Sequence, residues 1–271
     1  MRACRPGGGG AGASGAENGF PRRHRGGGDG SLAVVGIGPG GLDELTPRAR
    51  RAIATAEVVV GYRAYLSLIA SLLDGQEAVA TGMREEIERA RVAVERAQKG
   101  VRVAVVSGGD PGVYGMAAPV LEAAARAGVA DRVEVIPGIT AAAAAAALLG
   151  APIGHDFAVV SLSDLLTPWE VIERRLRAAA AADFVIVLYN PASTRRNWQF
   201  ARACAVTGEY RDQSTPVGIV WDAGRPEQRT VVTTLGAAPE EPVDMRAVVV
   251  VGSSQTRVVS GRLVTPRGYR W

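Results

Sequence analysis

The chain has 271 residues, of which 47% are hydrophobic and 5% aromatic, and this length suffices for one large domain or two smaller ones. Its net charge of +4 comes mainly from residues 1–30, which hold five of the 31 basic residues and two of the 27 acidic ones, so we expect no nucleic-acid binding by the near-neutral remainder. No apolar run approaches the roughly 20 residues of a membrane span, and we find no secretory signal, so we expect a cytoplasmic protein. One of the two cysteines, Cys4, lies within residues 1–30 and the other is Cys204, so we expect no structural disulfide.

Residues 1–30 are of low complexity, since eleven of them are glycine and Phe20 is the one large apolar side chain after Met1. Such a segment buries too little surface to offset the entropy of ordering it. We interpret it as a disordered extension or as the product of a start codon assigned too early. A basic arm that contacts nucleic acid is the alternative.

Residues 31–150 alternate strands and helices, with a glycine-rich turn after several strands. Thr46 followed by Pro47 indicates a helix start, because a hydroxyl caps the helix and proline fits its first turn. This alternation predicts an N-terminal α/β domain with a parallel sheet and ligands at the carboxyl ends of its strands. The expected strands are Leu32–Ile37, Val58–Val60, Val101–Val106 and Val133–Ile136, and the expected helices are Pro47–Ala56, 84–98, Met116–Ala127 and 140–149.

Residues 151–271 predict a second, C-terminal α/β domain. Thr167, Pro168 and Glu170 have the spacing of an N-cap, a first-turn proline and a capping-box acid, so a helix should begin there and run to Ala182. We therefore expect two α/β domains with a cleft between them. The other expected elements are strands at Phe157–Leu162, Phe184–Leu188, Val217–Trp221, Arg229–Leu235 and Ala247–Val251, and a helix at 194–206.

The turn Gly36–Gly41 has the spacing Gly-x-Gly-x-x-Gly of a dinucleotide-binding turn. Pro39, however, removes a backbone N–H that would bind pyrophosphate. The next strand ends in Gly61 and Tyr62, where an acid should bind the ribose. These departures argue against binding of a nicotinamide dinucleotide. A tight turn with a purely structural role and no ligand is a further alternative.

Two further turns of small residues follow strands, at Ser107–Gly115 and at Pro137–Ala141. Small residues let the backbone lie close to a ligand. Asp110 is either a helix N-cap or a carboxylate that faces a cationic or amino-bearing cofactor, and Thr140 is an N-cap by default. Three such turns at strand ends favour one shared ligand site.

Gly36–Gly41, Gly108–Pro111 and Pro137–Ala141 resemble the motifs of the tetrapyrrole methylases, which are class III S-adenosylmethionine methyltransferases. The resemblance covers residues 31–269 and leaves residues 1–30 without a counterpart. A narrower resemblance, to the precorrin-3B carbon-17 methyltransferases, rests on four blocks: Gly154–Trp169, Leu188–Pro191, Gly252–Arg257 and Val264–Tyr269.

This resemblance implies two α/β domains, a homodimer, and S-adenosylmethionine held in the cleft between the domains, without a metal. Matching the family's motifs residue by residue implies cofactor binding by Pro39, Gly108, Gly109, Asp110, Val113, Thr140, Ala141, Asn190, Val220 and Trp221.

The implied reaction is methylation of carbon 17 of a precorrin-3 species, metal-free or carrying cobalt, with ring contraction to the precorrin-4 level in cobalamin synthesis. Positioning drives methyl transfer, whereas contraction moves protons, for which His155 and Asp156 are the first candidates. Because the substrate carries many carboxylates, we expect contacts from some of Arg195, Arg196, Arg225, Arg257 and Arg267. The alternatives are a tetrapyrrole methylase of another ring position and a non-enzymatic nucleotide- or RNA-binding module.

Overall fold

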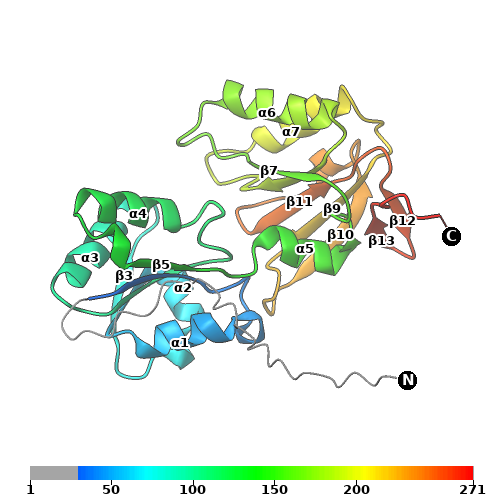
Figure 1. The fold of residues 1–271 in the computed structure, drawn as a ribbon. Coiled ribbons are helices and arrows are strands. Elements are labelled where there is room, and N and C mark those ends of the chain that lie inside the picture. Colours follow the sequence, from blue (N-terminus) through cyan, green and yellow to red (C-terminus); the bar gives the residue numbers. More distant parts are fainter. Residues whose placement is uncertain (1–29, 271) are drawn as a thin grey trace, which may run out of the picture.

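The computed structural model describes residues 30–270, which form two α/β units, each built on a five-stranded sheet (Figure 1). The predicted extension therefore lies outside the described residues except for Gly30. Within residues 30–270, no helix has the length and apolar character needed to cross a bilayer.

All strands of the first sheet are parallel, in the order β3-β2-β4-β1-β5. The central strands are buried on both faces, which explains their nearly continuous runs of valine. The strands are β1 (Leu32–Gly36), β2 (Val58–Tyr62), β3 (Glu77–Thr81), β4 (Val103–Ser107) and β5 (Val133–Ile136).

Helices cover both faces of this sheet. The core between α1, α2 and the sheet contains Ile53, and the core on the α3 and α4 face contains Val94. The predicted start of α1 is confirmed, because the Thr46 hydroxyl accepts a hydrogen bond from the Ala49 N–H at 3.1 Å. The helices are α1 (Pro47–Thr55), α2 (Arg63–Leu68), α3 (Glu86–Gln98) and α4 (Ala117–Arg126), with short 3-10 turns η1 (Leu42–Glu44), η2 (Ala70–Leu72) and η3 (Ala130–Arg132).

The second sheet has the order β10-β9-β11-β8-β7 and is mixed. Only β7 and β8 run parallel, and the other neighbours are antiparallel. Its strands are β7 (Phe157–Ser161), β8 (Val185–Tyr189), β9 (Pro216–Trp221), β10 (Arg229–Thr234) and β11 (Ala247–Val251).

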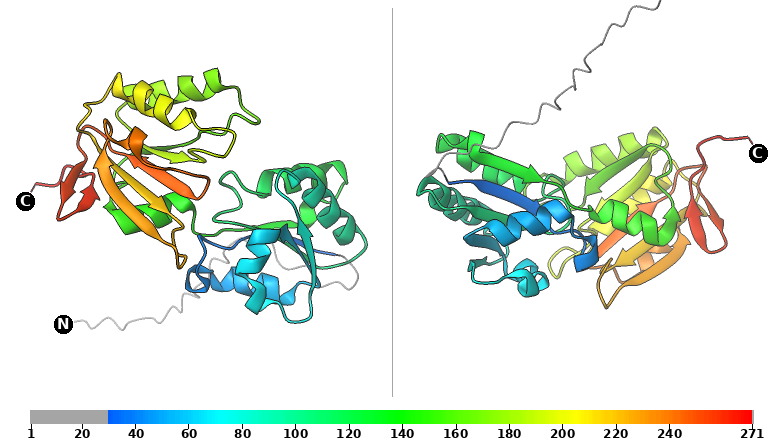
Figure 2. Two further views of the ribbon diagram at one scale, coloured as in Figure 1. Left: turned by 180° about the vertical axis from the view of Figure 1, so that it is seen from behind. Right: turned by 60° about the horizontal axis from the view of Figure 1, so that its bottom comes forward.

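Helices α6 (Trp169–Ala181) and α7 (Gln199–Gly208) cover one face of the second sheet, and α5 (Ala141–Leu149) covers the other. Although α5 follows β5 of the first sheet, it packs on β9 and β11 (Figure 2). Gly218 allows this close approach, because a Cβ there would lie 2.5 Å from Leu149 Cδ1. The domain boundary between residues 150 and 151 stays a prediction.

A small three-stranded sheet was not predicted from the sequence. It joins β6 (Gly150–Ala151) to the hairpin of β12 (Arg257–Val259) and β13 (Arg262–Val264). This hairpin lies at the end of the molecule away from the first sheet, in every view (Figures 1 and 2). A fourth 3-10 turn, η4 (Ala238–Glu240), precedes β11.

Two predicted helix starts are wrong. Helix α7 begins at Gln199 instead of residue 194, because Ser193 and Arg196 exchange two backbone hydrogen bonds and close a turn. The N-cap of α6 is Pro168, and no side chain caps this helix, so the predicted Thr167 cap is absent. Strand β3 and helix α2 were missed, because β3 is mostly exposed and α2 has only six residues.

Candidate functional site

The order of the first sheet places the three predicted turns side by side. Strand β1 lies between β4 and β5, so the turns that follow these three strands meet at one edge. Gly38 and Gly109 exchange backbone hydrogen bonds of 3.1 and 2.8 Å across two of the turns. The three turns therefore lie together, as one shared site requires.

Glycine is required where these backbones touch. A Cβ on Gly138 would lie 2.2 Å from the Gly109 carbonyl oxygen, and a Cβ on Gly36 would lie 2.6 Å from the Gly138 nitrogen. Real Cβ atoms do not approach backbone so closely, so these positions exclude any side chain. The turns thus form a backbone surface with little side-chain bulk.

Asp110 ties two of the turns together. Its Oδ1 accepts a hydrogen bond from the Gly112 N–H at 2.8 Å, and its Oδ2 accepts one from the Gly138 N–H at 3.1 Å. The N-cap alternative is wrong, because α4 begins at Ala117 with Met116 as its cap. Each carboxylate oxygen keeps a further lone pair, so Asp110 is able to accept from a ligand as well.

The second unit reaches this edge through Tyr189, the last residue of β8. Its hydroxyl accepts a hydrogen bond from the Ala142 N–H at 2.7 Å and lies 2.6 Å from the Thr140 hydroxyl. Thr140 is the N-cap residue of α5, but its own side chain makes no capping bond, so Tyr189 satisfies the helix end instead. Burial raises the pKa of Tyr189, which keeps the phenol protonated.

Asn190 follows β8 with a left-handed backbone (φ +52°), and its side-chain amide donates to the Ser161 hydroxyl at 3.0 Å. Tyr114 and Asp222, which follow β4 and β9, are also left-handed. Non-glycine residues rarely adopt this conformation, and such residues gather at binding sites. These three residues lie where the turns of the first sheet meet the second unit, a place we call the junction. The other left-handed non-glycine residues of the described chain lie elsewhere: Arg84 before α3, Asp183 after α6 and Ser260 between β12 and β13.

Val220 and Trp221 end β9 but are buried, with 1% and 5% of their surface exposed. Val220 packs in the core beneath α5, whereas Trp221 packs on the α6 and α7 face with the Arg229 guanidinium 3.8 Å from its ring centre. Both side chains are thus enclosed in these cores, and both residues pair with β10 and β11. Val113 lies at the junction, in the turn after Asp110.

Of the five predicted substrate arginines, Arg225 lies at the junction. Its Nε donates to the Pro39 carbonyl oxygen at 3.1 Å, which links the second unit to the first turn. Arg196 is buried and donates to the Asn190 carbonyl oxygen at 2.8 Å, so it supports the site from inside the protein. Arg195 is exposed in the loop before α7.

The remaining predicted residues are not brought to the junction. His155 and Asp156 precede β7, whereas Ser161, at its other end, contacts Asn190. The four steps from Phe157 to Ser161 span roughly 13 Å, and His155 lies beyond Phe157. His155 lies on a cavity of about 280 Å³ with Ser253 and Thr265. Arg257 and Arg267 belong to this C-terminal region, so the blocks at 154–156, 252–257 and 264–269 meet away from the turns.

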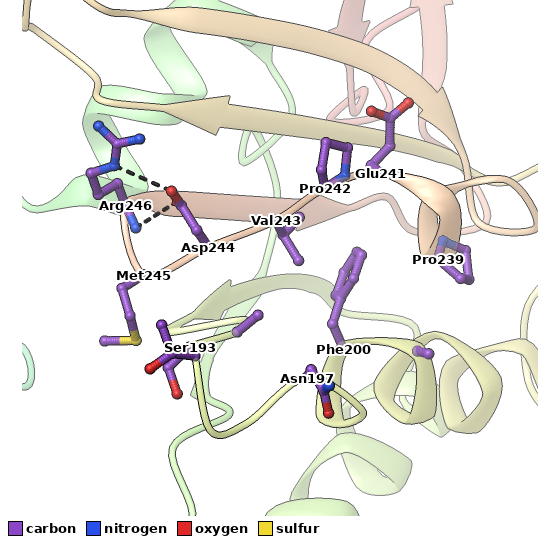
Figure 3. Close-up of a pocket in the computed structure, with 13 residues that line it drawn as sticks. Ser193, Asn197, Phe200, Pro239, Glu241, Pro242, Val243, Asp244, Met245 and Arg246 are labelled. Carbon is purple, nitrogen blue, oxygen red and sulfur yellow. Dashed lines mark hydrogen bonds and ion pairs between the residues drawn. The ribbon is translucent and has the colours of Figure 1, made fainter.

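A larger cavity of about 530 Å³ lies on the α7 side of the second sheet, beside the loop of residues 192–197 that precedes α7 (Figure 3). Phe200, Val243 and Met245 form part of its wall, and Met245 accepts a hydrogen bond from Arg196 at 3.1 Å. None of the predicted cofactor residues lines it. In the described part of the chain, no cluster of three histidine, cysteine or acidic side chains has the geometry of a metal site.

Sequence reasoning gave no role to Tyr114 or Tyr189, although both lie in quoted motifs. Their partners are 45 to 49 residues away in the chain. The available signal was a bulky aromatic residue within or beside a turn of otherwise small residues at a strand end.

The fold and the junction define a two-unit α/β protein with a candidate ligand site at the carboxyl ends of parallel strands. The family model of Tetrapyrrole (Corrin/Porphyrin) Methylases matches residues 31–239, and the chain belongs to this family.

Among curated relatives, the chain is 49% identical to a probable cobalt-factor III C(17)-methyltransferase of Salmonella typhimurium, over 88% of this chain and 99% of the relative. It is 47% identical to a precorrin-3B C(17)-methyltransferase of Sinorhizobium sp, over 89% of this chain and 97% of the relative.

Solved structures agree. The methyltransferase CobJ is 43% identical and superposes with a TM-score of 0.83, covering 88% of this chain and all of that one. The uroporphyrin-III C-methyltransferase of Thermus thermophilus, solved with the demethylated cofactor S-adenosylhomocysteine, is 28% identical with a TM-score of 0.63, covering 82% of this chain and 97% of that one.

Proposed function

We propose that this protein transfers a methyl group from S-adenosylmethionine to carbon 17 of a precorrin-3B-level tetrapyrrole, with ring contraction, in cobalamin biosynthesis. The observation that carries the proposal is the 49% identity to a carbon-17 methyltransferase over nearly the whole length of that relative. The two curated relatives differ in whether their names specify cobalt, so both substrate forms belong in the test.

The junction fits S-adenosylmethionine chemically. The three turns offer backbone groups without side-chain bulk, and the Asp110 carboxylate and the Asn190 side-chain carbonyl are acceptors suited to hydroxyl and amino groups. We propose that Pro39, Gly108, Gly109, Val113, Thr140 and Ala141 complete the site with the backbones of Val220 and Trp221.

S-adenosylmethionine supplies an activated methyl group on a sulfonium, so the protein needs no strong base for the transfer itself. The residues of the junction act by holding donor and acceptor in line, which contributes effective molarity. Arg225 is the best-placed cation for a substrate carboxylate, because it already bridges the two units beside Pro39.

Proton transfer during ring contraction remains assigned by hypothesis to His155 and Asp156. The backbone N–H of Asp156 donates to His155 Nδ1 at 2.8 Å, which leaves Nε2 to carry the ring proton. Because this pair lies at the opposite end of β7 from Asn190, a role in the same site requires that substrate reach that end. The homodimer, which the resemblance implies, and the cytoplasmic location, which the sequence composition favours, are likewise proposals.

The deciding experiment incubates the purified protein with methyl-labelled S-adenosylmethionine and either precorrin-3B or its cobalt form. We expect one labelled methyl group in the product and the absorbance change of a contracted ring. Melting curves with S-adenosylhomocysteine at about 100 times its Kd should show roughly 2.7 kcal/mol of stabilisation. Stabilisation without labelled product would indicate a methylase of another ring position, and no stabilisation would refute the cofactor assignment.

A further inference from the structure

Strand β7 is the outer strand of the second sheet, and its free edge is occupied by a side chain of the first unit. The Tyr114 hydroxyl donates to the Val159 carbonyl oxygen at 3.2 Å and accepts from the Ser161 N–H at 3.1 Å. In a parallel ladder, one residue of a neighbouring strand makes this same pair of bonds to the residues that flank one position. The phenol thus replaces one residue of a missing sixth strand.

The local backbone holds Tyr114 in this position. Tyr114 lies in the turn between β4 and α4 with a φ of +52°, which a tyrosine adopts only when its surroundings impose it. The residue remains 58% exposed, so burial is not what fixes its position. The two hydrogen bonds to β7 and a ring contact to Tyr189, with centroids 5.5 Å apart, are the interactions that hold it.

Tyr114 is connected on both sides to the proposed cofactor residues. Tyr189 continues the contact to Thr140 and to the start of α5. On the other side, Ser161 accepts a hydrogen bond from Asn190. Tyr114 is therefore one of the links that set the arrangement of the first unit's turns relative to Asn190, beside the Arg225–Pro39 hydrogen bond.

We propose that Tyr114 is a positioning residue: its hydroxyl docks the β4–α4 turn on the edge of β7 and so fixes the two units in the arrangement that binds the methyl donor. This inference rests on the proposed function for the identity of the ligand. Loss of the hydroxyl removes the link to β7 and leaves the Arg225–Pro39 and Tyr189–Thr140 contacts to hold the units, so part of the binding free energy is then spent on restoring their arrangement.

The test is Tyr114→Phe, which keeps the ring and removes both hydrogen bonds. By calorimetry, the Kd for S-adenosylhomocysteine should rise about three- to tenfold, the range expected for one or two modest hydrogen bonds. The KM for S-adenosylmethionine should rise by the same factor at unchanged kcat. In the protein without ligand, hydrogen exchange at the Ser161 amide should become faster.

Tyr210→Phe is the matched control, because Tyr210 is a half-exposed tyrosine that follows α7, away from the junction. It should leave the Kd and the Ser161 exchange unchanged. A Tyr114→Phe protein with a lower melting temperature but an unchanged Kd would show a purely structural role and overturn the inference. Equal exchange rates of the Ser161 amide in wild type and variant would overturn the docking itself. This measurement needs no ligand, so it is independent of the proposed function. Failure of the wild type to bind S-adenosylhomocysteine would instead refute the proposed cofactor.

Discussion

At the scale of single residues, the candidate site depends on glycines, whose lack of a side chain lets three turns pack closely. Gly36, Gly109 and Gly138 bring three backbones within contact of one another, and Asp110 joins two of the turns by accepting hydrogen bonds from their N–H groups. The specificity of such a surface comes from backbone groups at fixed distances, because few side chains intervene.

Gly138→Ala should therefore disrupt the junction. The added Cβ meets the Gly109 carbonyl oxygen at 2.2 Å, and overpacking of this kind costs about 1–3 kcal/mol. Urea unfolding should show this loss, and calorimetry should show weaker binding of S-adenosylhomocysteine. Gly112→Ala is the control for stability, since its Cβ meets only the Asp110 carboxylate at 3.2 Å. Equal stability of the two variants would contradict the prediction.

At the scale of elements, helices α6 and α7 are joined by one carboxylate. Glu173 of α6 accepts hydrogen bonds from Arg202 of α7, Arg177 and the Trp169 indole. The arginine bonds, that of Arg202 first, lower the pKa of Glu173 to about 2 from the usual 4.5. The proton is thus bound more weakly in the folded than in the unfolded protein.

The stabilisation by Glu173 is present above about pH 4.5 and is lost as the pH falls toward 2. Glu173→Gln should lower the unfolding free energy at pH 7 by about 1 kcal/mol, a modest value because the arginines are partly exposed. The gap to wild type should narrow in urea titrations at successively lower pH. Glu170→Gln, on the same helix, should give a smaller change, and a pH-independent gap for Glu173→Gln would disprove the assignment.

The elements also show what the sequence was able to predict. Valine runs followed by glycine-rich turns predicted β1, β4 and β5 and the meeting of their turns, because burial and backbone conformation leave a local signature. The start of α7 was missed because a hairpin-like turn at Ser193–Arg196 has no such signature. The contact of Tyr114 with β7 and the position of His155 beside Ser253 and Thr265 were not predictable for a related reason: both arise from contacts between residues distant in sequence.

At the scale of the whole molecule, the enzyme and the RNA-binding alternatives depend on different parts of the chain. Methyl transfer depends on the near-neutral residues 30–270, whereas a binding module would depend on the charged extension. Deletion of residues 1–29 should leave methyl transfer and the melting temperature unchanged within error. The reason is that the extension contains almost no large apolar residues to pack on the body. Filter binding of RNA by the full chain and the truncated chain is the companion measurement. Loss of methyl transfer on truncation would favour the arm-dependent binding module.

The position of α5 determines where the chain can be cut into two fragments that each fold. The helix is continuous in sequence with the first sheet, yet Ala142, Ala145 and Leu149 pack against the second. A fragment that ended at residue 150 would carry an uncovered apolar helix, while its complement would expose the β9 and β11 surface that this helix shields. Fragment complementation should instead succeed with a break just before Thr140, because α5 then stays in the same fragment as the second sheet that it covers.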